Sequence, residues 1–426
     1  MNTKYDACVI GLGYIGLPTA AIMADSGLSV LGIDINSAAV NSINAGKAHI
    51  VEPGLGELLQ RSVRSGALRA SVDLEPADAY IIAVPTPLRL DSTGKKRPDL
   101  SYVEAVVDKL APQIVAGNVI ILESTSPVGA TLAMRDQLRH LRPDLVWPSD
   151  VSDQPDVAIA YCPERVLPGN AITELVTNDR LIGGITQKCA ERAQQLYKKF
   201  VSGGDCVLTD AKTAEMAKLV ENASRDVQIA FANELSLMCD QLGVDVWELI
   251  ALANRHPRVS ILEPGPGVGG HCIAVDPWFL IDACESEAKL TAMARNINDG
   301  KPNWVVNKVL SLTKEVLEES NNLQKPVVAC FGLAFKPNID DFRESPSIQI
   351  VKALSTRSDL TLLVVEPYLK ENILPNTRLV SYEEAMKKAN IAVMLVNHSE
   401  FYNQPLRQGI KILDLKGVWP INEAPI

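Results

Sequence analysis

The 426-residue chain has no long hydrophobic run and no clustered cysteines, and we expect no leader segment from its first residues. Because no apolar run reaches the ~18 residues that a membrane helix needs, we expect no membrane insertion. Residues 1–16 contain neither a basic start followed by an apolar stretch nor a small-residue cleavage site. This predicts a cytoplasmic protein.

The eight cysteines are scattered, and none form a CxxC pair or a Cys/His cluster with zinc spacing. We therefore expect reduced thiols and no metal site. The formal net charge of −10 argues against nucleic acid as a partner, and a phosphate-bearing ligand would need a local basic pocket. What remains is the composition of a globular protein, with a length that predicts two or three domains.

A dinucleotide-binding fingerprint lies within the first forty residues. The apolar run 7–10 leads into G-x-G-x-x-G at residues 11–16, and a second apolar run, 28–33, ends at Asp34. Such glycines let the backbone approach a pyrophosphate at a helix N-terminus, and the acid accepts hydrogen bonds from the ribose hydroxyls. No arginine follows Asp34 to meet a 2′-phosphate, so the pattern predicts NAD and not NADP. The alternative is a tight turn without a ligand.

Two further strands are expected at 79–84 and 119–122, each followed by a polar segment. Ligands of doubly wound sheets lie at the carboxyl ends of strands, so Thr86 and Thr125 are expected near the cofactor. The alternative is that both hydroxyls only cap loops. After the apolar run 158–161 comes a charged loop with Glu164 and Arg165, which would face a substrate or form a surface ion pair.

A long helix is predicted from Asp210 to Leu242, because this stretch has neither proline nor glycine and Gly243 follows it. At ~1.5 Å per residue it is too long for one small sheet, so we expect it to connect two domains, and it could also form a dimer interface. Lys218, Asn222 and Arg225 fall on one face. They form either a pocket wall or an ordinary charged helix face, and a desolvated lysine there could transfer protons.

Four glycines within residues 264–270 strip side chains from the approach to Cys272. Backbone N–H groups in such a loop can form an anion or oxyanion site. A thiol beside a nicotinamide site has a chemical use, because an aldehyde can lose a hydride only after a nucleophile has added to its carbonyl. Asp276 follows four residues on, whereas the adjacent His271 is poorly placed to act as a base. Cys162 and Cys239 are expected to be buried hydrophobic residues.

A helix at 302–319 precedes a second alternating α/β region, with strands expected at 327–331, 360–365, 391–396 and 411–415. This region lacks G-x-G-x-x-G, so it should bind something other than a second dinucleotide. Lys336 and Arg343 suit phosphate. The predicted fold class is therefore α/β, with two Rossmann-like doubly wound parallel-sheet domains joined by a long central helix. The expected domains are residues 1–209 for NAD, 210–300 for the central helix, cysteine loop and dimerisation, and 301–426 for the sugar nucleotide.

The chain resembles the UDP-glucose/GDP-mannose dehydrogenase superfamily over almost its whole length, through residues 11–18, 123–125, 215–222, 267–272 and 332–346. Further stretches, at 49–53, 160–166, 254–259 and 271–278, are similar to its UDP-N-acetyl-D-mannosamine dehydrogenase branch, which serves bacterial surface-polysaccharide synthesis. The resemblance implies an NAD-dependent, two-step oxidation of a UDP-N-acetylhexosamine by a homodimer.

The resemblance also implies roles for individual residues. Contacts to NAD would come from Gly11, Gly13, Tyr14, Ile15, Gly16, Asp34, Thr86 and Thr125, and Arg343 would serve NAD or a substrate phosphate. The catalytic group would be the nucleophile Cys272, the proton-transferring Lys218, and Glu164, Asn222, Asp276 and Thr125. The nucleotide sugar would contact Arg165, Val166, Lys218, Asn222, Arg225, Gly269, Phe335 and Lys336, with His256 and Arg258 reaching the site of the second subunit.

Three alternatives stay open. The same chemistry could act on UDP-N-acetylglucosamine or UDP-glucose, because residue chemistry alone does not separate two C2 epimers. A simple one-step alcohol dehydrogenase would make one NADH per substrate in place of two. A non-catalytic sensor of NAD and nucleotide sugar would not need Cys272 or Lys218.

Overall fold

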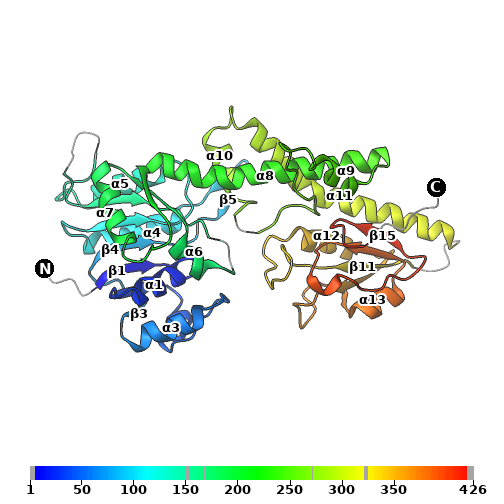
Figure 1. Cartoon of the computed structure of the whole chain (residues 1–426), viewed down its shortest axis with the longest axis horizontal. Helices are drawn as coiled ribbons and strands as arrows, with labels where there is room; N and C mark the ends of the chain where they lie inside the picture. Colours follow the sequence, from blue (N-terminus) through cyan, green and yellow to red (C-terminus); the bar gives the residue numbers. More distant parts are fainter. Residues whose placement is uncertain (1–4, 150–153, 167–168, 271, 321–324, 420–426) are drawn as a thin grey trace. The chain divides into compact units, whose positions relative to one another are not determined.

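The computed structural model describes residues 5–149, 154–166, 169–270, 272–320 and 325–419. Its contacts divide the chain into two compact units, residues 1–221 with 278–284 and residues 222–277 with 285–426 (Figure 1). His271, which the sequence suggested as a poor base, lies outside the described residues. The three expected domain boundaries stay predictions.

The first unit contains an eight-stranded sheet in which the order β3-β2-β1-β4-β7-β8 is that of a dinucleotide-binding fold. Its strands, from one edge to the other, are β10 (Cys206–Asp210), β9 (Arg180–Gly184), β8 (Ala158–Tyr161), β7 (Val119–Leu122), β4 (Ala77–Ile82), β1 (Tyr5–Ile10), β2 (Val30–Ile33) and β3 (Leu68–Ser71). All neighbours pair in parallel except β8 and β9, which are antiparallel. A separate hairpin joins β5 (Leu88–Leu90) to β6 (Lys96–Pro98).

Helices cover both faces of this sheet, because alternate residues of its strands are apolar on both sides. Ala7 and Val9 of β1 belong to one core, whereas Cys8 and Ile10 belong to the other. Residues from α1 (Gly16–Asp25), α2 (Ser37–Asn44), α3 (Leu55–Arg64), α6 (Ala171–Thr177) and α7 (Gln187–Tyr197) pack in the first core, and residues from α4 (Ser101–Leu110) and α5 (Ala130–Leu141) in the second. The doubly wound arrangement predicted from the sequence is confirmed.

The long helix α8 (Ala211–Leu242) matches its predicted bounds within one residue. Asp210 caps it, since Oδ1 accepts from the Thr213 N–H at 3.0 Å, and Gly243 after its end has φ +69. α9 (Val246–Ala253) and α10 (Asp276–Ala283) follow it in the chain. The helix expected at 302–319 was predicted too short, because α11 spans Lys289–Glu319 with Pro302 inside it. Buried hydrogen bonds from Arg295 and Asn298 to α8 stabilise the turns before the proline.

The second unit holds a five-stranded parallel sheet of order β13-β12-β11-β14-β15, again with the first strand in the centre. The strands are β11 (Val327–Phe331), β12 (Thr361–Val365), β13 (Arg378–Leu379), β14 (Ile391–Met394) and β15 (Lys411–Asp414). α11 and α12 (Pro346–Ser355) pack on one face of this sheet, and α13 (Tyr382–Lys388) packs on the other. Both predicted Rossmann-like sheets are therefore present.

Candidate functional site

The three glycines after β1 each have a distinct environment. Gly11 has φ +95, and a Cβ there would lie 2.6 Å from the Ala83 carbonyl oxygen. A Cβ at Gly16 would lie 1.8 Å from the Gly11 carbonyl oxygen, so α1 packs directly against the turn. At Gly13, nothing lies within 4 Å of the added Cβ, which leaves open space at the first turn of the helix. A tight turn, an open approach and close packing are what a dinucleotide pyrophosphate requires, and these residues fit NAD.

Asp34, at the end of β2, faces this turn. Its Oδ2 accepts from the Leu12 N–H at 3.0 Å, and its Oδ1 accepts from the Asn36 N–H at 2.8 Å. Each carboxylate oxygen can accept a further bond, as ribose hydroxyls would require. Ile15 immediately precedes α1, and the Tyr14 side chain is 45% exposed beside it. These positions fit the contacts to NAD predicted for them.

Thr86 and Thr125 meet at the carboxyl edge of the sheet. β4 and β7 pair in register, with Ile82 opposite Leu122, so the loops that follow lie side by side. The Thr86 hydroxyl donates to the Thr125 carbonyl oxygen at 2.5 Å. This bond fixes the two loops to each other next to the glycine turn.

Glu164 lies in a buried cluster and not in a surface ion pair. Its Oε2 accepts from Nη1 of Arg180 at 2.8 Å, and Oε1 accepts from the Arg165 N–H at 2.5 Å. Tyr197 donates to Oε1 of the buried Glu123 at 3.3 Å. Burial, with the nearby charge of Glu164, raises the pKa of Glu123 to about 8. Two carboxyl groups and one guanidinium thus share a dry interior at the ends of β7 and β8, a favourable place to store a proton.

The neighbouring charged residues of the first unit are also ion-paired or largely buried. Arg165 forms an ion pair with Glu221 of α8 at 2.8 Å, and Val166 beside it is half-buried. Lys218, one turn before Glu221, is only 9% exposed. Lys218 is therefore not part of a solvated, charged helix face. Its partial desolvation favours a role in proton transfer.

In the second unit, the glycine loop before Cys272 packs closely on residues 335–346. A Cβ at Gly269 would lie 2.5 Å from the Glu344 carbonyl oxygen, and one at Gly270 would lie 2.9 Å from the Phe335 ring. Side chains are excluded there because the backbone itself is in contact. The thiol of Cys272 is exposed, as is that of Cys284, whereas Cys162 and Cys239 are buried as predicted.

Asp276, four residues after Cys272, is buried against α8. Its Oδ2 accepts from Nδ2 of Asn222 at 2.5 Å, so these two predicted catalytic residues are in direct contact. The contact orients both the carboxylate and the amide. Arg225, one turn further along α8, is exposed.

The remaining predicted substrate residues lie at the surface or beside β11. His256 and Arg258 are exposed in the loop after α9, and Lys336 is partly buried in the loop after β11. Arg343 donates to Asp341 through Nε at 2.9 Å and Nη2 at 2.6 Å. A phosphate would have to share this guanidinium with Asp341.

Several buried polar residues around these groups were not found from the sequence. They are Glu123, Arg180 and Glu215 in the first unit, and Asp226, Asn233, Arg295 and Asn298 in the second. Glu215 caps the N-terminus of α5, accepting from the N–H groups of Gly129 at 2.6 Å and Thr131 at 2.8 Å. The face of α8 that carries Asn222 could have identified Asp226 and Asn233, which lie four and eleven residues on.

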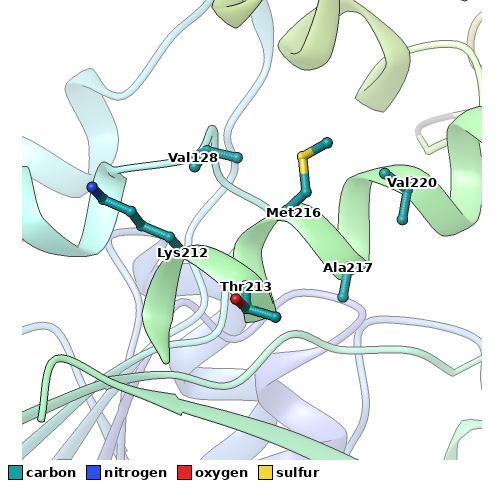
Figure 2. Close-up of a pocket in the computed structure, with 6 residues that line it drawn as sticks. All are labelled: Val128, Lys212, Thr213, Met216, Ala217 and Val220. Carbon is teal, nitrogen blue, oxygen red and sulfur yellow. The ribbon is translucent and has the colours of Figure 1, made fainter. Parts of the chain in front are cut away.

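A shallow pocket of about 400 Å³ lies on the first half of α8 (Figure 2). Its lining is mainly apolar, and it contains none of the predicted site residues: Val128, Lys212, Thr213, Met216, Ala217 and Val220. It is therefore not where the chemistry was predicted. Across the described residues, no group of histidine, cysteine or acidic side chains could hold a metal, and no helix is long and apolar enough to cross a membrane.

Family models match three parts of the chain. Residues 5–201 match the NAD binding domain of the UDP-glucose/GDP-mannose dehydrogenase family, residues 212–300 its central domain and residues 329–420 its UDP binding domain.

Individual proteins match over nearly the full chain. An NDP-N-acetyl-D-galactosaminuronic acid dehydrogenase from Ralstonia nicotianae is 52% identical over 96% of this chain and 95% of its own length. A UDP-N-acetyl-D-mannosamine dehydrogenase from Salmonella typhi is also 52% identical, over 96% of this chain and 98% of its own. The solved structure of a UDP-D-ManNAc dehydrogenase from Pyrococcus horikoshii superposes with a TM-score of 0.84 at 37% identity, covering 99% of this chain and 97% of that one.

Proposed function

We propose that this chain, which belongs to the UDP-glucose/GDP-mannose dehydrogenase family, oxidises C6 of UDP-N-acetyl-D-mannosamine from alcohol to carboxylate with two NAD. The observation that carries the proposal is the exposed Cys272 thiol after a glycine loop, in a chain whose first domain fits NAD. An alcohol dehydrogenase that stopped at the aldehyde would have no use for this nucleophile.

NAD, when bound, accepts a hydride in each of the two oxidations. Gly11, Gly13 and Gly16 would hold its pyrophosphate, and Asp34 its ribose. Thr86 and Thr125 would border the nicotinamide. In the first oxidation, Lys218 would accept the proton of the C6 hydroxyl or hold a water that does so.

The Cys272 thiolate would then add to the aldehyde carbon, forming a thiohemiacetal. Loss of a hydride from this adduct leaves a thioester on the same sulfur. Water attacks the thioester carbon, the C–S bond breaks, and the carboxylate leaves while the thiol is restored. Glu164 would position or deprotonate this water, and Asn222 and Asp276, already hydrogen-bonded to each other, would orient the reacting group.

Recognition of the nucleotide sugar is assigned to the residues that the sequence predicted for it. Arg165, Val166 and Arg225 would line the sugar site, and Gly269, Phe335 and Lys336 would contact the UDP part. Lys336 provides a cation for a phosphate. Because the chain as a whole is acidic, a phosphate needs such a local positive charge. Arg343 would support either this phosphate or NAD.

The configuration of the sugar has two candidates. The branch-specific residues 254–259 and 271–278 favour N-acetylmannosamine, whereas the Ralstonia relative, equally identical at 52%, is named for N-acetylgalactosaminuronic acid. An N-acetylgalactosamine nucleotide is therefore the second candidate. UDP-N-acetylglucosamine and UDP-glucose rank below both.

We assign the enzyme to the cytoplasm as a homodimer working in surface-polysaccharide synthesis. Support for the dimer comes from large exposed apolar side chains along α8 and on α11, namely Met216, Val220, Phe231, Met238, Leu242, Leu290 and Met293. His256 and Arg258, both exposed, would reach the second subunit's site.

The test is NADH formation with a panel of UDP-hexoses, with each product identified by mass. UDP-N-acetylmannosamine should give the highest kcat/KM and a uronic acid product. A higher kcat/KM with the galacto isomer would establish the second candidate, and no turnover with any UDP-hexose would reject the proposal.

A further inference from the structure

Three polar groups on α8 and α11 contact the backbone or side chains of residues 265–276, which include the proposed nucleophile. The Gly265 N–H donates to Oδ1 of Asn233 at 2.9 Å. The Ile273 carbonyl oxygen accepts from Nη1 of Arg295 at 3.5 Å, a long contact strengthened by the charge. Asp276 accepts from Asn222 at 2.5 Å. The contacts therefore lie on both sides of Cys272.

These contacts follow the helix in reverse order. Along α8, Asn233 contacts Gly265 and Asn222 contacts Asp276. Between them, Asp226 contacts Arg295, which in turn contacts Ile273. Positions 226 and 233 lie four and eleven residues after position 222, so the three positions share one helix face over roughly 16 Å. The segment thus runs antiparallel to α8.

A continuous buried hydrogen-bond chain joins the contact at Gly265 to the contact at Ile273. Asn233 donates to Oδ1 of Asn298 at 2.8 Å, and Asn298 donates to Oδ1 of Asp226 at 2.8 Å. Arg295 donates to the same Asp226 oxygen at 2.6 Å. These four side chains are at most 1% exposed. Both amides have one fixed orientation, because each oxygen accepts and each NH2 donates.

Stability alone does not explain this chain of residues. A buried ion pair contributes little net stability compared with well-packed apolar side chains. Two atoms of the pair, Asp226 Oδ2 and Arg295 Nε, are buried without a hydrogen-bond partner among the described residues. The polar side chains make hydrogen bonds to the loop backbone. Apolar residues could not make these bonds, and so could not hold the Gly265 N–H or the Ile273 carbonyl in one place.

We propose that Asp226, Asn233, Arg295 and Asn298 are positioning residues that hold the backbone on both sides of Cys272 in the geometry for attack on the aldehyde. Phe335 and Glu344 lie close to Gly269 and Gly270 of the same loop. The inference rests on the role of Cys272 proposed above. A small displacement of a nucleophile can reduce a rate by about a hundredfold, so the effect of breaking the chain should be large.

The test compares Asn233→Ala and Asn298→Ala with the control Val305→Ala in the full-length enzyme. Val305 is a buried core residue on α11 outside the hydrogen-bond chain, so its truncation lowers stability without touching the loop. For each variant, the melting temperature, kcat, KM for NAD and the alkylation rate of Cys272 by iodoacetamide, resolved by peptide mass, are measured.

Both asparagine variants should lose at least about tenfold in kcat, keep KM for NAD within about twofold, and show a changed pH profile of Cys272 alkylation. Val305→Ala should retain kcat and the wild-type alkylation profile at a similarly lowered melting temperature. Wild-type kcat and alkylation in Asn298→Ala, or an equal loss in Val305→Ala, would overturn the inference. If Asn233→Ala does not fold, Asn298→Ala, which leaves the Gly265 bond in place, decides. Formation of two NADH per substrate by the wild type would support the proposed function whichever result the variants give.

Discussion

Arg180 donates to the Glu164 carboxylate at 2.8 Å, and both side chains are buried at the ends of neighbouring, antiparallel strands. The guanidinium thus places a positive charge against the Glu164 carboxylate in the interior of the first unit. Burial and the charge of Glu164 raise the pKa of Glu123, beside them, to about 8. Glu123 is therefore largely protonated near neutral pH.

Glu123→Gln should change how stability depends on pH. In the unfolded chain this carboxyl titrates near 4.5, whereas in the folded protein it stays protonated up to about 8. Only the folded state holds this proton between those values, so wild-type stability falls as the pH rises across that window. The glutamine variant should lose less stability between pH 5.5 and pH 8.5 in urea unfolding. Equal losses in the two proteins would contradict the assignment.

Gly13→Ala and Gly16→Ala should separate cofactor binding from folding. The added Cβ at position 13 meets nothing within 4 Å, so that variant should keep its melting temperature within about 2 °C yet bind NAD at least about tenfold more weakly. At position 16 the Cβ would lie 1.8 Å from a carbonyl oxygen, so that variant should be clearly destabilised. Calorimetric titration measures the NAD affinity of each variant, and thermal melts measure its stability. Unchanged NAD affinity in Gly13→Ala would show that the pyrophosphate does not bind at this turn.

Cys272→Ala should abolish formation of the uronic acid and leave the dissociation constant for the UDP-sugar within about twofold, because the thiol forms a bond only with the aldehyde. Cys284→Ala is the matched control, since its thiol is also exposed but has no glycine loop before it. That control should keep full activity. Acid production by Cys272→Ala would exclude the thioester route.

Glu366→Gln should weaken binding of the nucleotide sugar and lower stability. Although burial opposes ionisation of Glu366, hydrogen bonds from His398 and from the Leu333 N–H, the latter at 2.5 Å, hold its pKa below the ordinary value. Its stabilising effect is present above pH 4.5 and is lost on acidification.

The variant should therefore be less stable than wild type at pH 7, by about 1–3 kcal/mol, with the difference shrinking toward pH 4. Because the same loop carries Lys336, KM for the UDP-sugar should rise while KM for NAD stays unchanged. A stability difference that stays constant from pH 7 to pH 4 would show that the charge of the Glu366 carboxylate does not contribute to stability.

The features predicted well from the sequence are those with local patterns. β1, the glycine turn and Asp34 lie within thirty residues of one another, and α8 had neither proline nor glycine to interrupt it. The length of α11 was missed because Pro302 looked like a helix start, whereas contacts of Arg295 and Asn298 with α8 stabilise the turns of the helix before it.

The buried partners of the site were missed for a different reason. Arg180 meets Glu164 only because β9 pairs antiparallel with β8, and nothing in a short strand ending in two glycines signals that direction. Asn233 and Asn298 are 65 residues apart and meet only through helix packing. Patterns in one sequence report which face a residue occupies, but not which distant polar group it contacts there.

The most direct test of the central claim is the number of NADH molecules formed per UDP-N-acetylmannosamine consumed, measured to completion with limiting sugar nucleotide. An enzyme that carries the aldehyde through a Cys272 thioester must make two, with the uronic acid as the product. One NADH per sugar, with an aldehyde as the product, would contradict the account.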